Sequence, residues 1–212
     1  MAKNKSASKA KEELDDDATH THYPAPEAEE EVVHRHILTM IAKDRAGTLS
    51  RIMNLFSARN YNIDGLAASN IDADREISCI TLSTRGTDKV IKQLCKQLER
   101  VVNVYHVSNV SSTKDRVIRE LALIKVRAEG EKRLEALSIA NSFRANIVDA
   151  SRDTIIIEMV APPEKLSTFI DVLRPLGVVD IVRSGVTGMI NSSYSPLEDI
   201  MKEEDRNKNG DR

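Results

Sequence analysis

The turn Lys43–Leu49 combines residue types that suit the recognition of a small charged molecule. Gly47 lets the backbone approach a ligand closely, because glycine has no side chain to obstruct it. It precedes a predicted helix whose first N–H groups lack intrahelical partners, and such groups bind carboxylates. Asp44 offers a carboxylate to an ammonium group. The turn therefore presents complementary groups for both ends of a zwitterion.

A second short segment, Asn62-Ile63, supplies the remaining contacts that a free α-amino acid needs. The amide of Asn62 can hydrogen-bond to either end of the ligand, and Ile63 offers an apolar wall for its side chain. Asp and Gly are also ordinary turn-forming residues, so the pattern alone leaves a purely structural turn open. The predicted effector-binding residues are Asp44, Gly47, Thr48, Leu49, Asn62 and Ile63.

Hydrophobic periodicity predicts the elements that position these residues. A strand over 33–41 is apolar on both alternations, as in the interior of a sheet. A helix with Leu49, Ile52, Met53 and Phe56 on one face follows it. Two strands, a second helix begun by Gly86-Thr87-Asp88, and a fourth strand complete the order β-α-β-β-α-β, which is the ferredoxin-like arrangement. The three strands are predicted over 63–70, 76–83 and 102–109, and the apolar residues of the second helix recur from Val90 to Val101.

The same order of elements recurs in the second half of the chain. Pro162-Pro163 begins the second helix, since proline fits a helix's first turn, and Gly177 ends it. The predicted ranges are strand 116–127, helix 131–143, strands 145–150 and 154–160, helix 162–176 and strand 178–183. We therefore expect an α+β fold of two tandem ferredoxin-like domains, at 33–110 and 115–190.

Polar segments flank these domains. Residues 1–32 are charged and acidic and cannot bury enough apolar surface to fold, so a disordered tail is expected. His20 and His22 in this tail form at most a weak metal site. Residues 191–212 form a second polar tail, with a short helix predicted over 196–202.

Composition excludes several classes of protein. The net charge of −2 and an aromatic content of 3% argue against a nucleic-acid partner or an acidic membrane surface. The sequence contains no run of 18 apolar residues, so no membrane-spanning helix is predicted. Cys79 and Cys95 lie in apolar patterns and are interpreted as buried thiols of a cytoplasmic protein.

No pattern in the chain predicts catalysis. A phosphate-binding glycine loop, a nucleotide fingerprint and zinc-ligand spacing are all missing from the sequence. His34 and His36 at the start of the first strand are interpreted as solvated or interface histidines. We therefore predict no catalytic residue, no metal site and no cofactor on this chain.

Five longer runs carry a resemblance to a known family. Residues 44–52 and 55–66, which include DRAGTLSRI and LFSARNYNIDGL, resemble the ACT domain of the acetohydroxyacid (acetolactate) synthase small subunit. The runs at 116–126, 143–149 and 182–188 resemble the second domain of the same family. The resemblance extends from about residue 33 to residue 190.

The resemblance implies a regulatory function. Members of the family bind and activate a large catalytic subunit, which carries thiamine diphosphate, magnesium and FAD and joins two 2-oxo acids with loss of carbon dioxide. They also confer feedback inhibition by valine or other branched-chain amino acids. The alternative is a stand-alone ACT-type amino-acid sensor that regulates another enzyme.

The predicted sheet geometry adds an expectation about assembly. Two helices cover one face of a four-stranded sheet, and the other face needs cover because its first strand is apolar on both sides. A homodimer formed edge to edge or face to face through the first domain would provide that cover.

Overall fold

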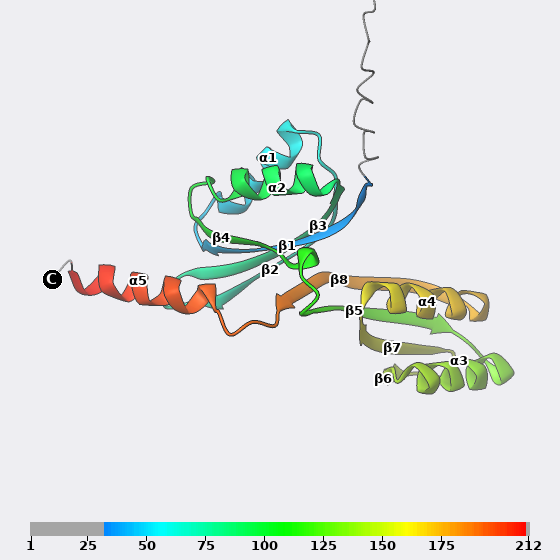
Figure 1. The fold of residues 1–212 in the computed structure, drawn as a ribbon. Coiled ribbons are helices and arrows are strands. Elements are labelled where there is room, and N and C mark those ends of the chain that lie inside the picture. The colour runs from blue at the N-terminus through cyan, green and yellow to red at the C-terminus, as the bar shows by residue number, and fades with distance from the viewer. Residues whose placement is uncertain (1–31, 211–212) are drawn as a thin grey trace, which may run out of the picture. The chain divides into compact units, whose positions relative to one another are not determined.

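The computed structural model describes residues 32–210, with side chains to residue 206, so the predicted N-terminal tail lies outside the described residues. The first domain is a four-stranded antiparallel sheet in the order β2-β3-β1-β4. Helices α1 and α2 cover one of its faces (Figure 1). Its elements are β1 (His34–Lys43), α1 (Thr48–Ala58), β2 (Ile63–Asp72), β3 (Ile77–Gly86), α2 (Asp88–Leu98) and β4 (Val104–Asn109).

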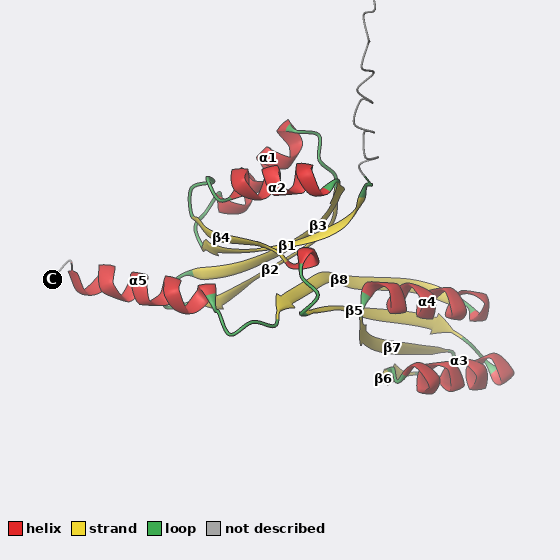
Figure 2. Ribbon diagram, viewed as in Figure 1, coloured by secondary structure: helices red, strands yellow, loops and turns green. Residues whose placement is uncertain are grey.

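The second domain repeats this arrangement, with a sheet in the order β6-β7-β5-β8 (Figure 2). The predicted fold class of two tandem ferredoxin-like domains is therefore confirmed. Its elements are β5 (Arg116–Arg127), α3 (Gly130–Phe143), β6 (Asn146–Ala150), β7 (Thr154–Ala161), α4 (Pro163–Leu173) and β8 (Val178–Ile190). A 3-10 turn, Val110–Ser112, lies between the domains, and a second one, Arg174–Leu176, follows α4.

Local chemistry begins the helices where the sequence predicts. The hydroxyl of Thr87 accepts a hydrogen bond from the N–H of Val90 at 3.4 Å and so caps α2. Pro163 occupies the first turn of α4, where its missing N–H costs nothing. Gly47 precedes α1 with φ of 87°, a left-handed conformation that glycine adopts without strain.

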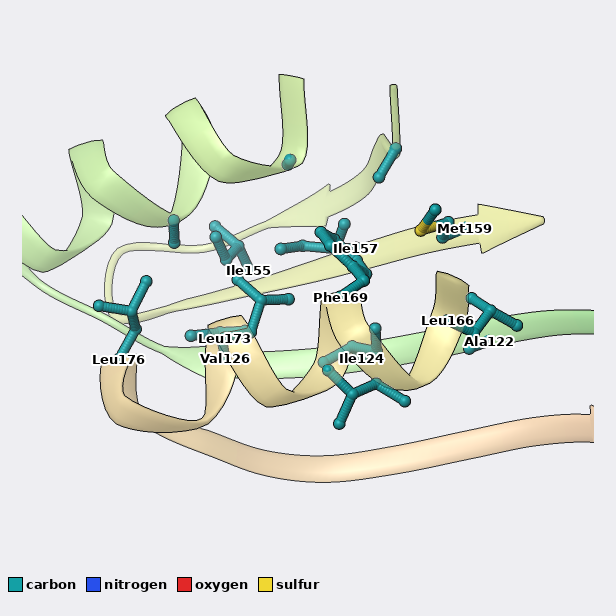
Figure 3. Packing of buried hydrophobic residues seen from close by; sticks show 14 of the residues in the cluster. Ala122, Ile124, Val126, Ile155, Ile157, Met159, Leu166, Phe169, Leu173 and Leu176 are labelled. Atoms are coloured by element: carbon teal, nitrogen blue, oxygen red, sulfur yellow. The ribbon is translucent and has the colours of Figure 1, made fainter. Parts of the chain in front are cut away.

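Each domain has its own apolar core. In the first domain, Leu38, Met40 and Ala42 of β1 pack against the two helices. In the second, Phe169 and Leu173 of α4 lie over the strands that carry Ile155, Ile157 and Val126 (Figure 3). The predicted apolar face of α1 is wrong at one position. Leu49 is 38% exposed, whereas Thr48 is buried in its place.

The opposite face of the first sheet is partly covered by the chain itself. Ile37 of β1 packs with Val110 and with Val186 of β8 in a small shared core. The hydroxyl of Thr39 donates a hydrogen bond to the carbonyl of Gly188 at 3.3 Å. The last strand was predicted to end at residue 183, but β8 continues to Ile190 and crosses this face. This cover removes the reason given for face-to-face pairing of two copies.

The C-terminal segment also differs from the prediction. Residues 196–210 form a helix, α5 (Pro196–Gly210), where a polar, disordered tail with a helix of only seven residues was expected. Glu204 of α5 accepts hydrogen bonds from Lys43 Nζ at 2.7 Å and from the hydroxyl of Tyr105 at 2.5 Å. Burial and this carboxylate raise the pKa of Tyr105. Such pairing between distant residues leaves no periodic signal in the sequence.

Both cysteines are free, and they are half-buried where buried thiols were expected. Burial raises the pKa of the Cys79 thiol, and burial together with the nearby Glu99 raises that of Cys95 to about 11. Because only the thiolate reacts with iodoacetamide, and its fraction falls tenfold per pKa unit, we expect Cys95 alkylation at pH 8 to be ~100-fold slower than in the unfolded chain. Mass spectrometry over time, with and without urea, measures the ratio. Equal rates for folded and unfolded chains contradict the prediction.

No helix among the described residues is long and apolar enough to cross a membrane.

Candidate effector site

The corner between β1 and α1 has the geometry of an anion-binding helix start. The structure gives α1 no side-chain cap. The N–H of Thr48 donates to the carbonyl of Arg45 at 3.1 Å, so the N–H groups of Leu49 and Ser50 are the ones available to a ligand. A Cβ placed on Gly47 meets no heavy atom within 4 Å, and the space in front of the helix is therefore open. The partial positive charge at a helix N-terminus favours a carboxylate in this position.

Asp44 is held in place by β2 and by the turn between β2 and β3. Its N–H donates to the carbonyl of Glu76 at 2.5 Å, and its Oδ2 accepts a hydrogen bond from Asn70 Nδ2 at 2.8 Å. The carboxylate is exposed and is able to accept a further donor, such as an ammonium group. Thr48 contributes in another way, since its buried hydroxyl accepts from Asn103 Nδ2 at 3.1 Å and fixes the start of the helix.

Asn62 and Ile63 lie at the other end of the same sheet. Ile63 pairs with Thr84, which pairs with His36 at the start of β1, whereas the corner follows Lys43 at the end of β1. Seven residues of strand separate these two levels, or about 23 Å. A free amino acid is much shorter than this distance. Within one chain, the structure therefore does not bring Asn62 and Ile63 together with Asp44, Gly47, Thr48 and Leu49.

A polar cavity of about 740 Å³ adjoins Asn62 and Ile63. Charged side chains from both domains line it, including Arg35, Arg85, Arg183, Asp64, Glu120 and Glu164. Most of these charges are paired: Arg183 forms two hydrogen bonds with the buried Glu120, at 2.8 and 2.5 Å, and Arg85 pairs with Asp64 at 3.1 Å. Among the described side chains, Arg35 Nε is the buried polar atom without a partner.

Sequence reasoning missed this cavity because the segments that line it are far apart along the chain. They converge only after the two domains come into contact through β8. Gly185 marks that contact, since a Cβ at this position would lie 3.0 Å from the carbonyl oxygen of Leu66 in β2. The positive φ of Gly185, 80°, is a further reason for glycine there.

The fold and the open helix corner define a class: a tandem ferredoxin-like protein of the ACT type. Residues 38–106 match the family described as AHAS small subunit-like ACT domain, and residues 119–192 match that described as Small subunit of acetolactate synthase.

Individual relatives agree with both matches. The chain is 37% identical over 159 residues to a probable acetolactate synthase small subunit of Archaeoglobus fulgidus, which covers 75% of this chain and 98% of that protein. It is also 37% identical over 155 residues to the acetolactate synthase small subunit of Mycolicibacterium smegmatis, with 73% of this chain and 89% of that protein covered. The crystal structure of the Thermotoga maritima acetolactate synthase small subunit superposes with a TM-score of 0.69 at 31% identity, covering 76% of this chain and 99% of that chain.

The chain belongs to the acetolactate synthase small subunit family, and the resemblance inferred from the sequence is confirmed. This membership supports the role of a regulatory subunit that partners an acetolactate synthase catalytic subunit. A stand-alone ACT-type sensor accounts for the first domain only and leaves the match at residues 119–192 unexplained.

Proposed function

We propose that this protein activates the large catalytic subunit of acetolactate synthase in the cytoplasm and makes it sensitive to branched-chain amino acids. The chemistry, which joins two 2-oxo acids with loss of carbon dioxide, takes place on the partner with its thiamine diphosphate, magnesium and FAD. The observation that carries the effector site is the open, uncapped start of α1 beside the exposed carboxylate of Asp44. These two groups complement the carboxylate and the ammonium of one amino acid.

The separation of the two halves of the predicted site favours a homodimer. β2 is an edge strand, with β3 on its inner side, and an unpaired edge is a template for pairing with another chain. In a two-fold pairing of β2 with its own copy, the strands run antiparallel, so the start of one β2 lies beside the end of the other. Asn62 and Ile63 stand at that start, and Asn70, which holds Asp44, stands near that end. Two copies thus assemble two complete sites, each with residues from both chains.

Coupling follows from this arrangement. An amino acid that bridges two copies stabilises the paired geometry that fits it, and it shifts activity only if the catalytic subunit prefers another geometry. A coupling free energy of about 1–3 kcal/mol between effector and catalytic subunit is typical.

Calorimetry of the full-length chain with L-valine, L-leucine and L-isoleucine, with D-valine as control, tests the ligand class. If none of the three L-amino acids produces heat of binding, the proposal that a branched-chain amino acid is the effector is wrong.

A charge on the edge of β2 is expected to separate the copies. Ile71 is 43% exposed near the end of β2, and Ile71→Lys places two ammonium groups in the proposed seam of the dimer. We expect a monomer in analytical ultracentrifugation and at least tenfold weaker binding of the effector. Val172→Lys is the matched control, because Val172 is 41% exposed on α4, far from the seam in sequence and fold. A dimer that persists in Ile71→Lys refutes pairing through this edge.

A further inference from the structure

Two histidines and an aspartate meet at one end of the first sheet. His34 Nε2 lies 3.3 Å from Asp88 Oδ1, and His36 Nε2 lies 3.8 Å from the same oxygen. The two imidazole rings are 4.2 Å apart between centroids. Each residue offers one ligand atom, and the three atoms lie within 4.8 Å of one another. The cluster plays no part in the effector site.

The fold places these residues together for simple reasons. His34 and His36 are two positions apart on β1, so their side chains leave the same face of the sheet. His34 pairs with Gly86 at the end of β3, and Asp88 follows two residues later as the first residue of α2. Thr87 caps that helix and thereby fixes the position of Asp88. Paired strands and a capped helix set the backbone positions of all three residues.

We propose that His34, His36 and Asp88 bind a divalent transition-metal ion of the zinc type. Imidazole nitrogen and carboxylate oxygen are ligands of Zn²⁺, with bonds of about 2.0–2.2 Å. Ligand atoms around a tetrahedral ion are then about 3.3–3.5 Å apart. The two distances to Asp88 Oδ1, 3.3 and 3.8 Å, are close to this requirement. Three protein ligands leave the fourth position for water.

The surroundings of His34 prepare it as a ligand. Its Nδ1 lies 3.2 Å from the backbone carbonyl of Val32, which favours a proton on Nδ1 and leaves the lone pair of Nε2 for the ion. Such a hydrogen bond to the second ring nitrogen is a regular feature of metal-binding histidines.

His36 is less accessible, because its side chain is 1% exposed and its Nε2 lies 3.2 Å from the carbonyl of Gly86. The contact with Gly86 holds a proton on Nε2, and Nδ1 faces Asn109 Nδ2 at 3.4 Å. An ion must replace the Gly86 contact and move that proton, which limits the affinity. The exposed His34 and Asp88 provide the path of entry.

Metal binding would tie the start of β1 to the start of α2. It would therefore stabilise the folded chain, since an ion that binds only the native state raises its stability by mass action. The metal would act at the end of the sheet where Asn62 and Ile63 lie, because His36, Thr84 and Ile63 are at one level of the strand register. The site is chemically independent of the amino-acid effector.

The test uses the full-length chain, free of any affinity tag and stripped with a chelator, titrated with Zn²⁺ in a calorimeter. Co²⁺ provides a second readout, because tetrahedral Co²⁺ absorbs strongly in the visible range. We expect one ion per chain, with the melting temperature raised by at least about 5 °C at saturating metal. His34→Ala and Asp88→Asn change exposed side chains and should keep the fold. Each should weaken Zn²⁺ binding at least tenfold and remove the cobalt spectrum.

Two controls separate this site from other histidines. His106→Ala removes an imidazole that bonds to Ser108 on β4 and belongs to no such cluster, and it should leave binding unchanged. The double variant His20→Ala/His22→Ala should also bind one ion. The proposal is overturned if His34→Ala binds Zn²⁺ as the unmodified chain does, or if the His20/His22 variant loses the ion. The proposal is also overturned if the unmodified chain shows no detectable binding of Zn²⁺.

Discussion

Replacing Gly47 by Asp is expected to abolish feedback inhibition while leaving activation of the catalytic subunit within about twofold of normal. A side chain on Gly47 points into open space, where no heavy atom lies within 4 Å. It therefore does not displace the core but occupies the region in front of the α1 N-terminus. The new carboxylate accepts hydrogen bonds from the N–H groups available at the start of α1 and repels the carboxylate of an amino acid. We expect the concentration of valine needed for half-inhibition to rise at least ~100-fold, since repulsion and steric exclusion act together.

A backbone cost accompanies this substitution, because Gly47 has φ of 87° and other residues are strained there. Gly130→Asp is the matched control. Gly130 also begins a helix with positive φ, 55°, and a Cβ on it likewise meets nothing within 4 Å. Strain alone should affect both variants equally. Inhibition assays on the reconstituted enzyme with leucine, isoleucine and valine measure the half-inhibition concentration of each variant and so separate strain from loss of the effector site. Normal feedback in Gly47→Asp would show that the corner does not bind the effector.

Phe169→Ala is expected to lower the free energy of unfolding by about 3–5 kcal/mol. Phe169 of α4 is fully buried in the core of the second domain, and its ring lies 5.0 Å from that of Phe143 between centroids. Removing the ring leaves a cavity that the rigid surroundings fill only in part. Because single domains are stable by only about 5–15 kcal/mol, this loss should leave the second domain partly unfolded near 37 °C.

Urea denaturation followed by circular dichroism measures the change. Val172→Ala serves as the control on the same helix, because Val172 is 41% exposed and its truncation should cost less than about 1 kcal/mol. The two domains share the small core of Ile37, Val110 and Val186, so we also expect Phe169→Ala to loosen the cover on the first sheet. If Phe169→Ala and Val172→Ala unfold at the same urea concentration, the surroundings of residue 169 close in and leave no cavity, and the prediction is wrong.

The elements of both domains could be predicted because their signals are local. Strand β5 was predicted with its observed bounds, Arg116–Arg127, since alternation and flanking polar residues mark both of its ends. Thr87 and Pro163 begin helices through bonds and backbone angles confined to a few neighbouring residues. Gly47 was singled out for a close approach of the backbone to a ligand; its positive φ is a separate finding of the structure.

Features that depend on contacts between distant segments could not be predicted. The extension of β8 to Ile190 is stabilised by the first domain, through Thr39 and Ile37, and not by a stronger strand pattern. Helix α5 docks through Glu204, which meets Lys43 from the far end of the sequence. Leu49 fits the helical stripe by spacing, but it is 38% exposed in the folded domain.

The sequence by itself determined the two repeated folds, the family and the identity of the residues at the β1–α1 corner, because these rest on periodicity and on motifs of consecutive residues. Only the tertiary structure decided that Asn62 and Ile63 lie a whole strand away from that corner, that β8 covers the open face of the first sheet, and that His34, His36 and Asp88 converge. The register between strands fixes these distances. It is set by hydrogen bonds and packing across the sheet, and a pattern read along one strand does not contain it.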